Sequence, residues 1–252
     1  MSLLISKVFT YDVDAGNYIQ AVEAADAQAL EPATRQAINN FVIGCKQDGI
    51  WTAIKASCIL AGARTLAGAL VPLAGTAPTN FNFVSGDYNR KTGLVGDGVN
   101  KYLDSNRNAS LDPAGNSHLA IYKSSDNTNG NFLIGANNGS GRQIQSLTTV
   151  GFYDCSRVGI VSVNGFGIGF MGYSNNATQL SARALGSTNT NAAAISGSEN
   201  GDIFVFTRNI GGVNSGATGA RLSYYSIGES LDLALLDARV TALINAFAAA
   251  IP

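Results

Sequence analysis

The stretch Asn80–Arg107, NFNFVSGDYNRKTGLVGDGVNKYLDSNR, alternates short apolar pieces with residues that form turns. Its turn clusters include Ser85–Asp87, Gly96–Gly98 and Asp104–Asn106. Glycine and asparagine tolerate the positive φ values that tight hairpins require. The spacing therefore predicts short antiparallel strands joined by tight turns.

The same pattern extends over residues 57–228, where turn clusters rich in Gly and Asn separate short runs of strand-forming residues. The candidate strands are Cys58–Leu60, Ala69–Leu73, Asn82–Ser85, Leu94–Gly96, Tyr102–Asp104, Ser117–Lys123, Asn131–Ala136, Gln143–Thr148, Arg157–Asn164, Gly167–Tyr173, Gln179–Arg183, Asp202–Arg208 and Arg221–Ile227. Many short strands with no helix between them are typical of an all-β sandwich. We expect a mainly β protein with an antiparallel jelly-roll β-sandwich over this range.

Residues 12–56 have helical periodicity and predict a small N-terminal helical cap, preceded by an extended arm over residues 1–11. Asp12 can cap a first helix, and Pro32 suits the first turn of a second. Gly49 is a natural left-handed stop after that helix. A third short helix is expected from Ile50 through Ala56.

Residues 229–252 return to helical periodicity and predict a C-terminal amphipathic helix over Glu229–Ala250, with Ser230 as its cap. Its apolar stripe comprises Leu233, Leu236, Val240, Leu243, Ile244 and Phe247. A stripe of this width packs against another element. We expect the N-terminal helices to be that element, in preference to an external partner.

Composition excludes several classes of protein. Charged residues make up 13% of the chain, the net charge is −1, and the 16 Lys and Arg residues are scattered, so a nucleic-acid partner is not expected. The apolar runs are too short or too broken for membrane insertion, and the N-terminus lacks the features of a secretory signal. Cys45, Cys58 and Cys155 form no CxxC pair and are expected to be unpaired, mostly buried thiols.

Catalytic patterns are sparse in this sequence. His118 is the single histidine and lies in a strand pattern, which favours a partly buried structural role. The motifs HExxH, GxSxG and the P-loop are missing from the sequence. A jelly-roll glycosidase needs two carboxylates across a cleft, and no Glu-x-Asp-x-Glu arrangement occurs. We therefore expect a protein that is not an enzyme, with no catalytic residues and no cofactor.

Two kinds of ligand site remain open at this stage. Calcium could be held by oxygen ligands from loops, but each candidate is equally a turn residue that bonds its own backbone, and the turn role is favoured. The calcium candidates are Asp87, Asp97, Asp104, Asp112, Asp126 and Asn127. A glycan-binding rim would combine aromatic and polar side chains, although aromatic residues in strands more often belong to a core. The rim candidates are Tyr88, Asn89, Arg90, Phe152, Tyr153 and Tyr173.

Several segments together carry a resemblance to a known group of proteins. These segments are Phe41–Lys46, Asp48–Trp51, Lys55–Ala63, Gly86–Arg90, Gly93–Gly98, Lys101–Leu103 and Tyr224–Asp232. As a set they resemble virion structural proteins of tailed bacteriophages, including phages of cyanobacteria. The β part of those proteins is similar to concanavalin A-like or laminin G-like jelly rolls.

The resemblance implies a non-enzymatic virion protein, assembled in the host cytoplasm and displayed on the particle surface in a tail, baseplate or fibre, or as a capsid decoration. Its expected partners are other virion proteins and further copies of itself. The alternative is a lectin-like adhesin that recognises glycans on the host surface.

Overall fold

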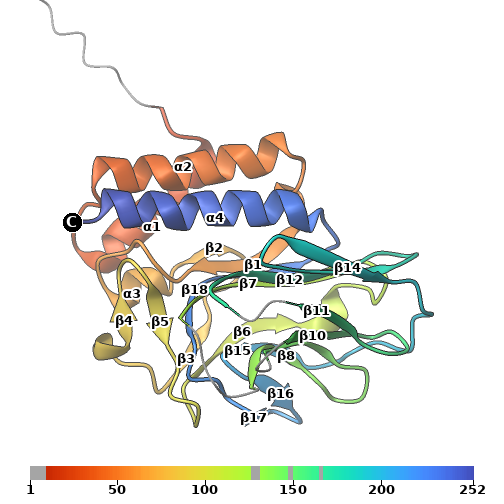
Figure 1. Ribbon diagram of the computed structural model, residues 1–252. Coiled ribbons are helices and arrows are strands. Elements are labelled where there is room, and N and C mark those ends of the chain that lie inside the picture. Colours follow the sequence, from red (N-terminus) through yellow and green to blue (C-terminus); the bar gives the residue numbers. More distant parts are fainter. Residues whose placement is uncertain (1–9, 126–130, 147–149, 165–166) are drawn as a thin grey trace, which may run out of the picture.

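The computed structural model describes residues 10–125, 131–146, 150–164 and 167–252 (Figure 1). Two β-sheets lie face to face, and a layer of helices from both ends of the chain covers the outer face of one sheet. The predicted fold class, a mainly β antiparallel sandwich with N-terminal helices and a C-terminal helix, is confirmed. Residues 1–9 of the expected N-terminal arm lie outside the described residues.

Helices form the layer above the sandwich and a few short connections. The α-helices are α1 (Val13–Asp26), α2 (Pro32–Gln47), α3 (Leu66–Ala69) and α4 (Leu233–Ala250). Single 3₁₀ turns occur at Trp51–Ala53, Ser85–Asp87 and Ala109–Leu111.

Sheet A is the sheet beneath the helices. Its strands run in the order β14 (Ser187–Asn191), β13 (Leu180–Ala184), β12 (Gly169–Asn175), β7 (Ser117–Ser125), β18 (Arg221–Gly228), β1 (Ile54–Ile59) and β2 (Pro72–Ala74). Two short strands join this sheet beside β18, namely β5 (Gly93–Val95) and then β4 (Tyr88–Asn89).

Sheet B forms the opposite face of the sandwich. Its order is β11 (Val161–Asn164), β10 (Val150–Cys155), β9 (Arg142–Ser146), β8 (Phe132–Ala136), β15 (Asp202–Val205), β6 (Tyr102–Asn108) and β3 (Thr79–Phe81), with β16 (Arg208–Ile210) and β17 (Val213–Ser215) alongside. Strand pairing in both sheets is antiparallel, apart from a short parallel contact between β16 and β8.

The stretch Asn80–Arg107 crosses between the two sheets. β3 and β6 pair in sheet B, whereas the β4–β5 hairpin between them belongs to sheet A. The predicted strand Asn82–Ser85 is wrong, because Asn82 has a φ of 67° and ends β3. Asn80 then holds the turn, with its side chain bonded to both the amide and the carbonyl of Phe83.

Other strand predictions also need correction. The predicted strand Ala69–Leu73 is wrong over most of its length, because α3 ends at Ala69 and β2 begins only at Pro72. The predicted strand Asp202–Arg208 is two strands, β15 and β16, because Phe206 between them has a φ of 73°. The expected strands did not include β3, β4, β10, β14 or β17. β14 is a run of Ser, Thr and Asn, which lacks the apolar alternation that identifies a strand in sequence.

The centre of sheet A is buried on both faces. Between the sheets lies one core, to which β7 contributes Leu119 and Ile121. Above the sheet lies a second core, to which the same strand contributes Ala120 and Tyr122. The central strands therefore carry apolar side chains at successive positions instead of alternating apolar and polar ones.

The N-terminal helices begin largely where the sequence predicts. Asp12 caps α1 by accepting a hydrogen bond from the amide of Asp14 (3.0 Å), and α2 begins at Pro32. Gly49 follows α2 with a φ of 72°, the left-handed stop that was expected. The predicted third helix is wrong: a single 3₁₀ turn ends at Ala53, and β1 begins at Ile54 because its residues pair with β18.

α4 packs on α2 and on β12, so the prediction of an internal partner for its apolar stripe is confirmed. All six stripe residues are buried. The predicted cap, Ser230, is wrong: Asp232 caps the helix by accepting from the amides of Ala234 (2.7 Å) and Leu235 (3.2 Å).

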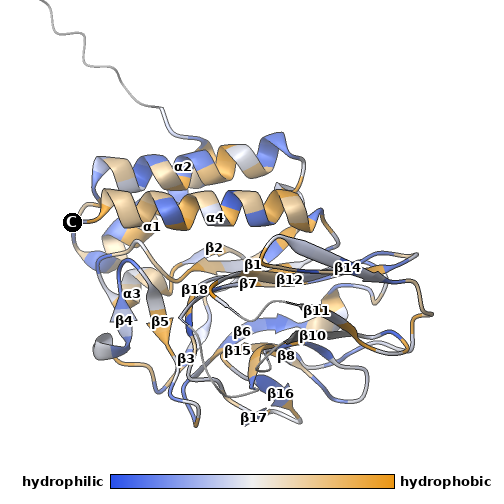
Figure 2. Cartoon of the chain, viewed as in Figure 1, coloured by the Kyte–Doolittle hydropathy of each residue, from blue (hydrophilic) through white to orange (hydrophobic). Residues whose placement is uncertain are grey.

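α4 is long and apolar enough to span a membrane by length and composition, and Figure 2 shows it as more apolar than α2. Packing inside the protein accounts for its most apolar face.

Partly buried polar contacts fix the helical layer to the sandwich. The carboxylate of Asp26, at the end of α1, accepts from the amides of Arg64 (2.6 Å) and Thr65 (2.8 Å). Glu31 forms a bidentate pair with Arg90, at 2.8 and 3.1 Å. That hydrogen-bonded pair lowers the pKa of Glu31 to about 2.

The thiols of Cys45 and Cys58 are unpaired and buried, as expected. Burial raises the pKa of each to about 12, so both are unreactive packing groups. The side chain of Cys155 lies outside the described residues.

Leu236 gives a direct test of the helical layer. The substitution Leu236→Asp should lower the free energy of unfolding by about 3 kcal/mol or more, because it buries an unpaired carboxylate. Leu235→Asp is the matched control: Leu235 is 36% exposed and lies in the first turn of α4, whereas Leu236 is fully buried. Urea unfolding followed by circular dichroism measures both variants. Equal midpoints for the two would contradict the packing described here.

Candidate functional site

The described side chains of the expected glycan rim do not come together on the surface. Tyr173 is fully buried in the core between the sheets, so its prediction as a rim residue is wrong. Phe152 and Tyr153 lie on β10, and their side chains are outside the described residues.

The rim candidates on and beside β4 are engaged in contacts within the protein. The Tyr88 hydroxyl donates to the carbonyl of Ala63 (2.8 Å), and burial raises the pKa of Tyr88. The side chain of Asn89 accepts from the amides of the turn that follows it. Arg90 is committed to Glu31 and to Ala63, which makes it part of the contact between cap and sandwich.

The candidate calcium ligands have roles in turns and ion pairs. Asp97 accepts hydrogen bonds from three successive backbone amides, at residues 99–101. Asp104 accepts from the amide of Asn106, Asp87 pairs with a lysine, and Asp112 pairs with an arginine. Asp126 and Asn127 are outside the described residues. The favoured turn role is therefore confirmed for Asp97 and Asp104.

His118 has the structural role that its strand pattern predicts. Its Nδ1 lies 2.6 Å from the carbonyl oxygen of Glu229, and its Nε2 lies 2.6 Å from the hydroxyl of Ser226. A carbonyl can only accept, so Nδ1 carries the proton and Nε2 accepts from the serine. Burial lowers the pKa of His118 to about 4, which keeps the ring neutral. The neutral ring ties β7 to the segment that leads into α4.

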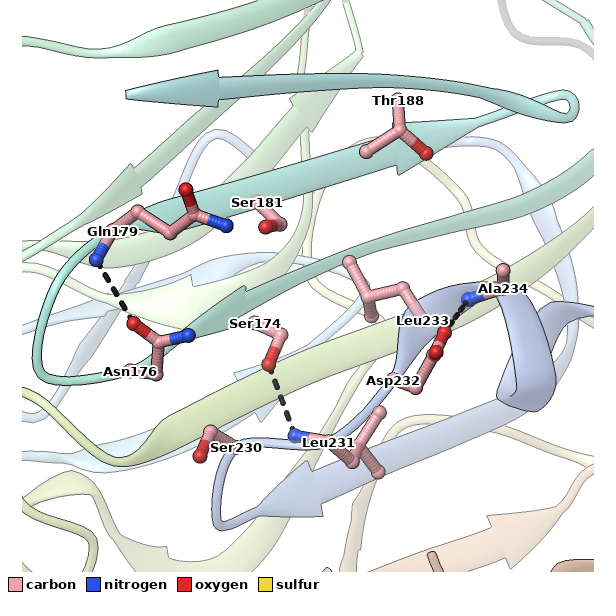
Figure 3. A pocket seen from close by; sticks show the side chains of 10 residues that line it. All are labelled: Ser174, Asn176, Gln179, Ser181, Thr188, Ser230, Leu231, Asp232, Leu233 and Ala234. Carbon is pink, nitrogen blue, oxygen red and sulfur yellow. Dashed lines mark hydrogen bonds between the residues drawn. The ribbon is translucent and has the colours of Figure 1, made fainter. Parts of the chain in front are cut away.

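A polar groove lies where α4 begins, beside the β13–β14 hairpin of sheet A. We call it the edge groove; its volume is about 450 Å³. Its lining residues are Ser174, Asn176, Gln179, Ser181, Thr188, Ser230, Leu231, Asp232, Leu233 and Ala234. Figure 3 shows the hairpin side chains on one side of the groove and the start of α4 on the other.

The groove forms because the helical layer stops before the edge of the sheet. α4 packs on β12 and β13, and an ion pair between Arg183 and Asp237 (2.8 Å) fastens it there. β14 lies beyond the helix, and four of its five residues are exposed. On β13, buried residues alternate with partly exposed ones, so Ser181 faces outward beside the helix.

Some of the polar groups in the groove are held in place. The Ser174 hydroxyl oxygen accepts from the amide of Leu231 (3.0 Å), and the carbonyl oxygen of the Asn176 side chain accepts from the amide of Gln179 (2.9 Å). Thr188 accepts from Arg183 (3.1 Å).

Other groups in the groove remain available to a ligand. Within the described part of the chain, the side-chain amide of Gln179 and the hydroxyl of Ser181 have no hydrogen-bond partner. The groove therefore presents fixed hydroxyl and amide groups together with unengaged ones, an arrangement that suits a polyhydroxylated ligand.

The charge of the groove is weakly negative. Asp232 is the one carboxylate among its lining residues, and its Oδ1 caps α4. The neighbouring cation, Arg183, is bonded to Asp237, to Thr188 and to the carbonyl of Gly186. The arrangement suits a neutral ligand better than an anionic one.

Sequence reasoning missed the edge groove because its residues come from three separate segments and include no aromatic side chain. One signal was present: along β13, polar and apolar residues alternate, which marks an outward-facing polar row. The sequence does not show that α4 would begin beside that row.

Comparisons with known proteins add no family. No family model matches the sequence, and no curated protein matches it. Among solved structures, the chain is similar to the leech intramolecular trans-sialidase (11% identity, TM-score 0.37, 53% of this chain and 23% of that one). It is also similar to the NanB sialidase from Streptococcus pneumoniae (11% identity, TM-score 0.42, 55% of this chain and 26% of that one).

A third similar structure is the CBM40 of the Ruminococcus gnavus IT-sialidase bound to α2,3-sialyllactose (12% identity, TM-score 0.36, 49% of this chain and 80% of that one). The chain spans about a quarter of the length of the two sialidases. Likeness at these values carries no argument about ligand or activity.

His118 predicts a defined pH dependence of stability. Its pKa is about 4 in the folded protein against 6.5 for the unperturbed group, so the unfolded chain binds the proton more tightly. The stabilisation is complete above pH 6.5 and is lost as the pH falls toward 4, by up to about 3 kcal/mol. In His118→Asn, the unfolding free energy should fall less steeply across this window. Urea unfolding at several pH values measures it; parallel profiles would contradict the assignment.

Proposed function

We propose that this chain is a non-enzymatic surface protein of a tailed-bacteriophage particle, and that its edge groove binds a neutral glycan of the host surface. The virion setting rests on the sequence resemblance described above. The proposal of a glycan ligand rests on one structural observation: a groove of hydroxyl and amide groups, some fixed and some unengaged, at the exposed edge of sheet A.

The chemistry of the groove supports binding in preference to turnover. Hydrolysis of a glycosidic bond by the usual route needs two carboxyl groups flanking the scissile bond. The groove lining offers one, Asp232, and its Oδ1 is hydrogen-bonded to the first turn of α4. The next carboxylate along that helix, Asp237, is ion-paired with Arg183. Both carboxylates therefore have structural roles in the folded protein.

The electrostatics of the groove favour a neutral sugar over a sialylated one. Recognition of a carboxylated sugar calls for a cation that can pair with it. Arg183, the cation beside the groove, is occupied by Asp237. The lining of the groove also lacks an aromatic side chain on which a sugar could stack, so we expect the groove to bind a glycan weakly.

A glycan array with the full chain tests this proposal. Neutral oligosaccharides should bind, and sialylated ones should bind more weakly. The double substitution Gln179→Ala with Ser181→Ala should weaken binding at least about 10-fold, equivalent to about 1.4 kcal/mol. Its melting temperature should stay unchanged, because neither side chain has a partner within the described protein.

Two control variants separate the loss of groove contacts from effects of surface substitution or of lower stability. Gln28→Ala changes an exposed glutamine in the helical layer and should leave binding intact. Arg90→Ala removes the pair with Glu31; it should lower the melting temperature while leaving the groove and its affinity unchanged. Loss of binding in Arg90→Ala at temperatures where that variant is folded, or full binding by the double variant, would contradict the groove as the site.

The virion setting has its own test. An antibody to the chain should label purified phage particles, and the labelled position separates a tail or baseplate component from a capsid decoration. Copies that follow the symmetry of the shell, with no glycan bound by the isolated protein, would favour the purely structural alternative. Absence of the chain from purified particles would contradict the virion proposal.

A further inference from the structure

β14 is an open edge strand without the usual protection. It is the last strand of sheet A and pairs with β13 through five consecutive residues without a register shift. Its sequence, Ser-Thr-Asn-Thr-Asn, contains neither a charged residue nor proline, and Ser187–Thr190 are exposed. Natural edge strands commonly carry lysine, proline, a bulge or a covering segment that prevents pairing with another chain. In the described part of the chain, β14 has no charge, proline or register shift. Its contact with sheet B is made to β11, where the Asn189 side chain donates to the carbonyl of Ser162.

The hairpin geometry determines which backbone groups of β14 face outward. Leu185 and Gly186 form the turn with φ values of 48° and 82°, the signature of a type I′ hairpin. Its closing pair, Ala184 with Ser187, is a hydrogen-bonded pair, and such pairs alternate along an antiparallel ladder. Thr188 and Thr190 therefore belong to non-hydrogen-bonded pairs with β13. Their backbone N–H and C=O groups point away from β13, toward the open edge of the sheet.

We propose that β14 pairs with β14 of a second copy of this chain, antiparallel, about a two-fold axis at Asn189. In this register Thr188 lies opposite Thr190 of the partner subunit, and each such pair exchanges both outward-facing backbone hydrogen bonds. Cross-strand pairs of threonine are favourable. The edge is therefore complementary to itself, as a two-fold interface requires.

Exposed apolar side chains at the two ends of β14 support the same partner. At the turn end, Ile168 is 57% exposed and Leu185 is 42% exposed. At the other end, Val158 is 61% exposed and Ile195 is 42% exposed, and the 158 segment lies beside Asn191. The two-fold axis brings the turn end of one copy beside the opposite end of the other. Apolar surface that is exposed in one copy would then be covered at both ends of the paired strands.

The pairing also has a consequence for ligand binding, and this consequence rests on the proposed function. A two-fold axis perpendicular to the joined sheets keeps the same face of sheet A on the same side in both copies. Both edge grooves therefore open on that side, near the dimer axis. Two weak sites on one rigid body can bind a glycan-coated surface about 100-fold or more tightly than one site.

Sedimentation of the full chain, over a range of concentrations and without glycan, tests the dimer. The weight-average mass should rise from 26.0 kDa toward twice that value. Thr190→Pro should raise the dimer dissociation constant at least 10-fold, because it removes an outward-facing N–H while leaving the β13 ladder intact. Thr190→Lys, a second disruption that keeps the backbone, should act in the same direction.

Val213→Lys is the matched control, since it adds the same charge to an exposed strand of sheet B and should not affect the dimer. A wild-type chain that stays at 26.0 kDa, or Thr190 variants that dimerise like the wild type, would overturn the pairing. Glycan binding is measured separately: the monomeric variant should keep its affinity for a soluble oligosaccharide and lose about 100-fold on a glycan-coated surface. A dimer that binds no glycan would contradict the proposed function alone.

Discussion

The structure depends on a sheet that is buried on both of its faces. Sheet A separates two apolar cores, and its central strands β7 and β18 contribute side chains to each. Neither core could form without the sheet between them, and the sheet cannot expose either face to water at its centre. Sheet B and the helical layer are therefore both required by the same strands, although they come from different parts of the chain.

Both proposed functional features, the edge groove and the free edge of β14, lie where the helical layer over sheet A ends. α4 lies over β12 and β13 and leaves the last strand, β14, bare. The β13–β14 hairpin supplies the polar wall of the edge groove, and the outer edge of β14 supplies the unpaired backbone groups. A strand of Ser, Thr and Asn tolerates both situations because its side chains need no burial. The proposed glycan site and the proposed self-pairing thus share one cause.

Sequence patterns could predict the elements whose burial repeats regularly. The stripe of α4, with Leu236 and Val240, and the cap at Asp12 follow from local periodicity and chemistry. β14 could not be identified in this way, since a strand with no buried side chain has no apolar signal. Positive φ values at Asn82 and Phe206, set by tertiary contacts, likewise ended strands that local composition would extend. The groove combines three distant segments, so it becomes visible only when the sheet order is known.

The sheet order also determines when the protein can fold. β18 is the last strand along the chain, yet it occupies the middle of sheet A, between β7 and β1. During synthesis on the ribosome, β7 and β1 cannot pair with β18 until residues 221–228 have been made. Long-range pairing of this kind slows folding and leaves strand edges unpaired meanwhile. Sheet A and both cores can therefore be completed only after residues 221–228 have been made.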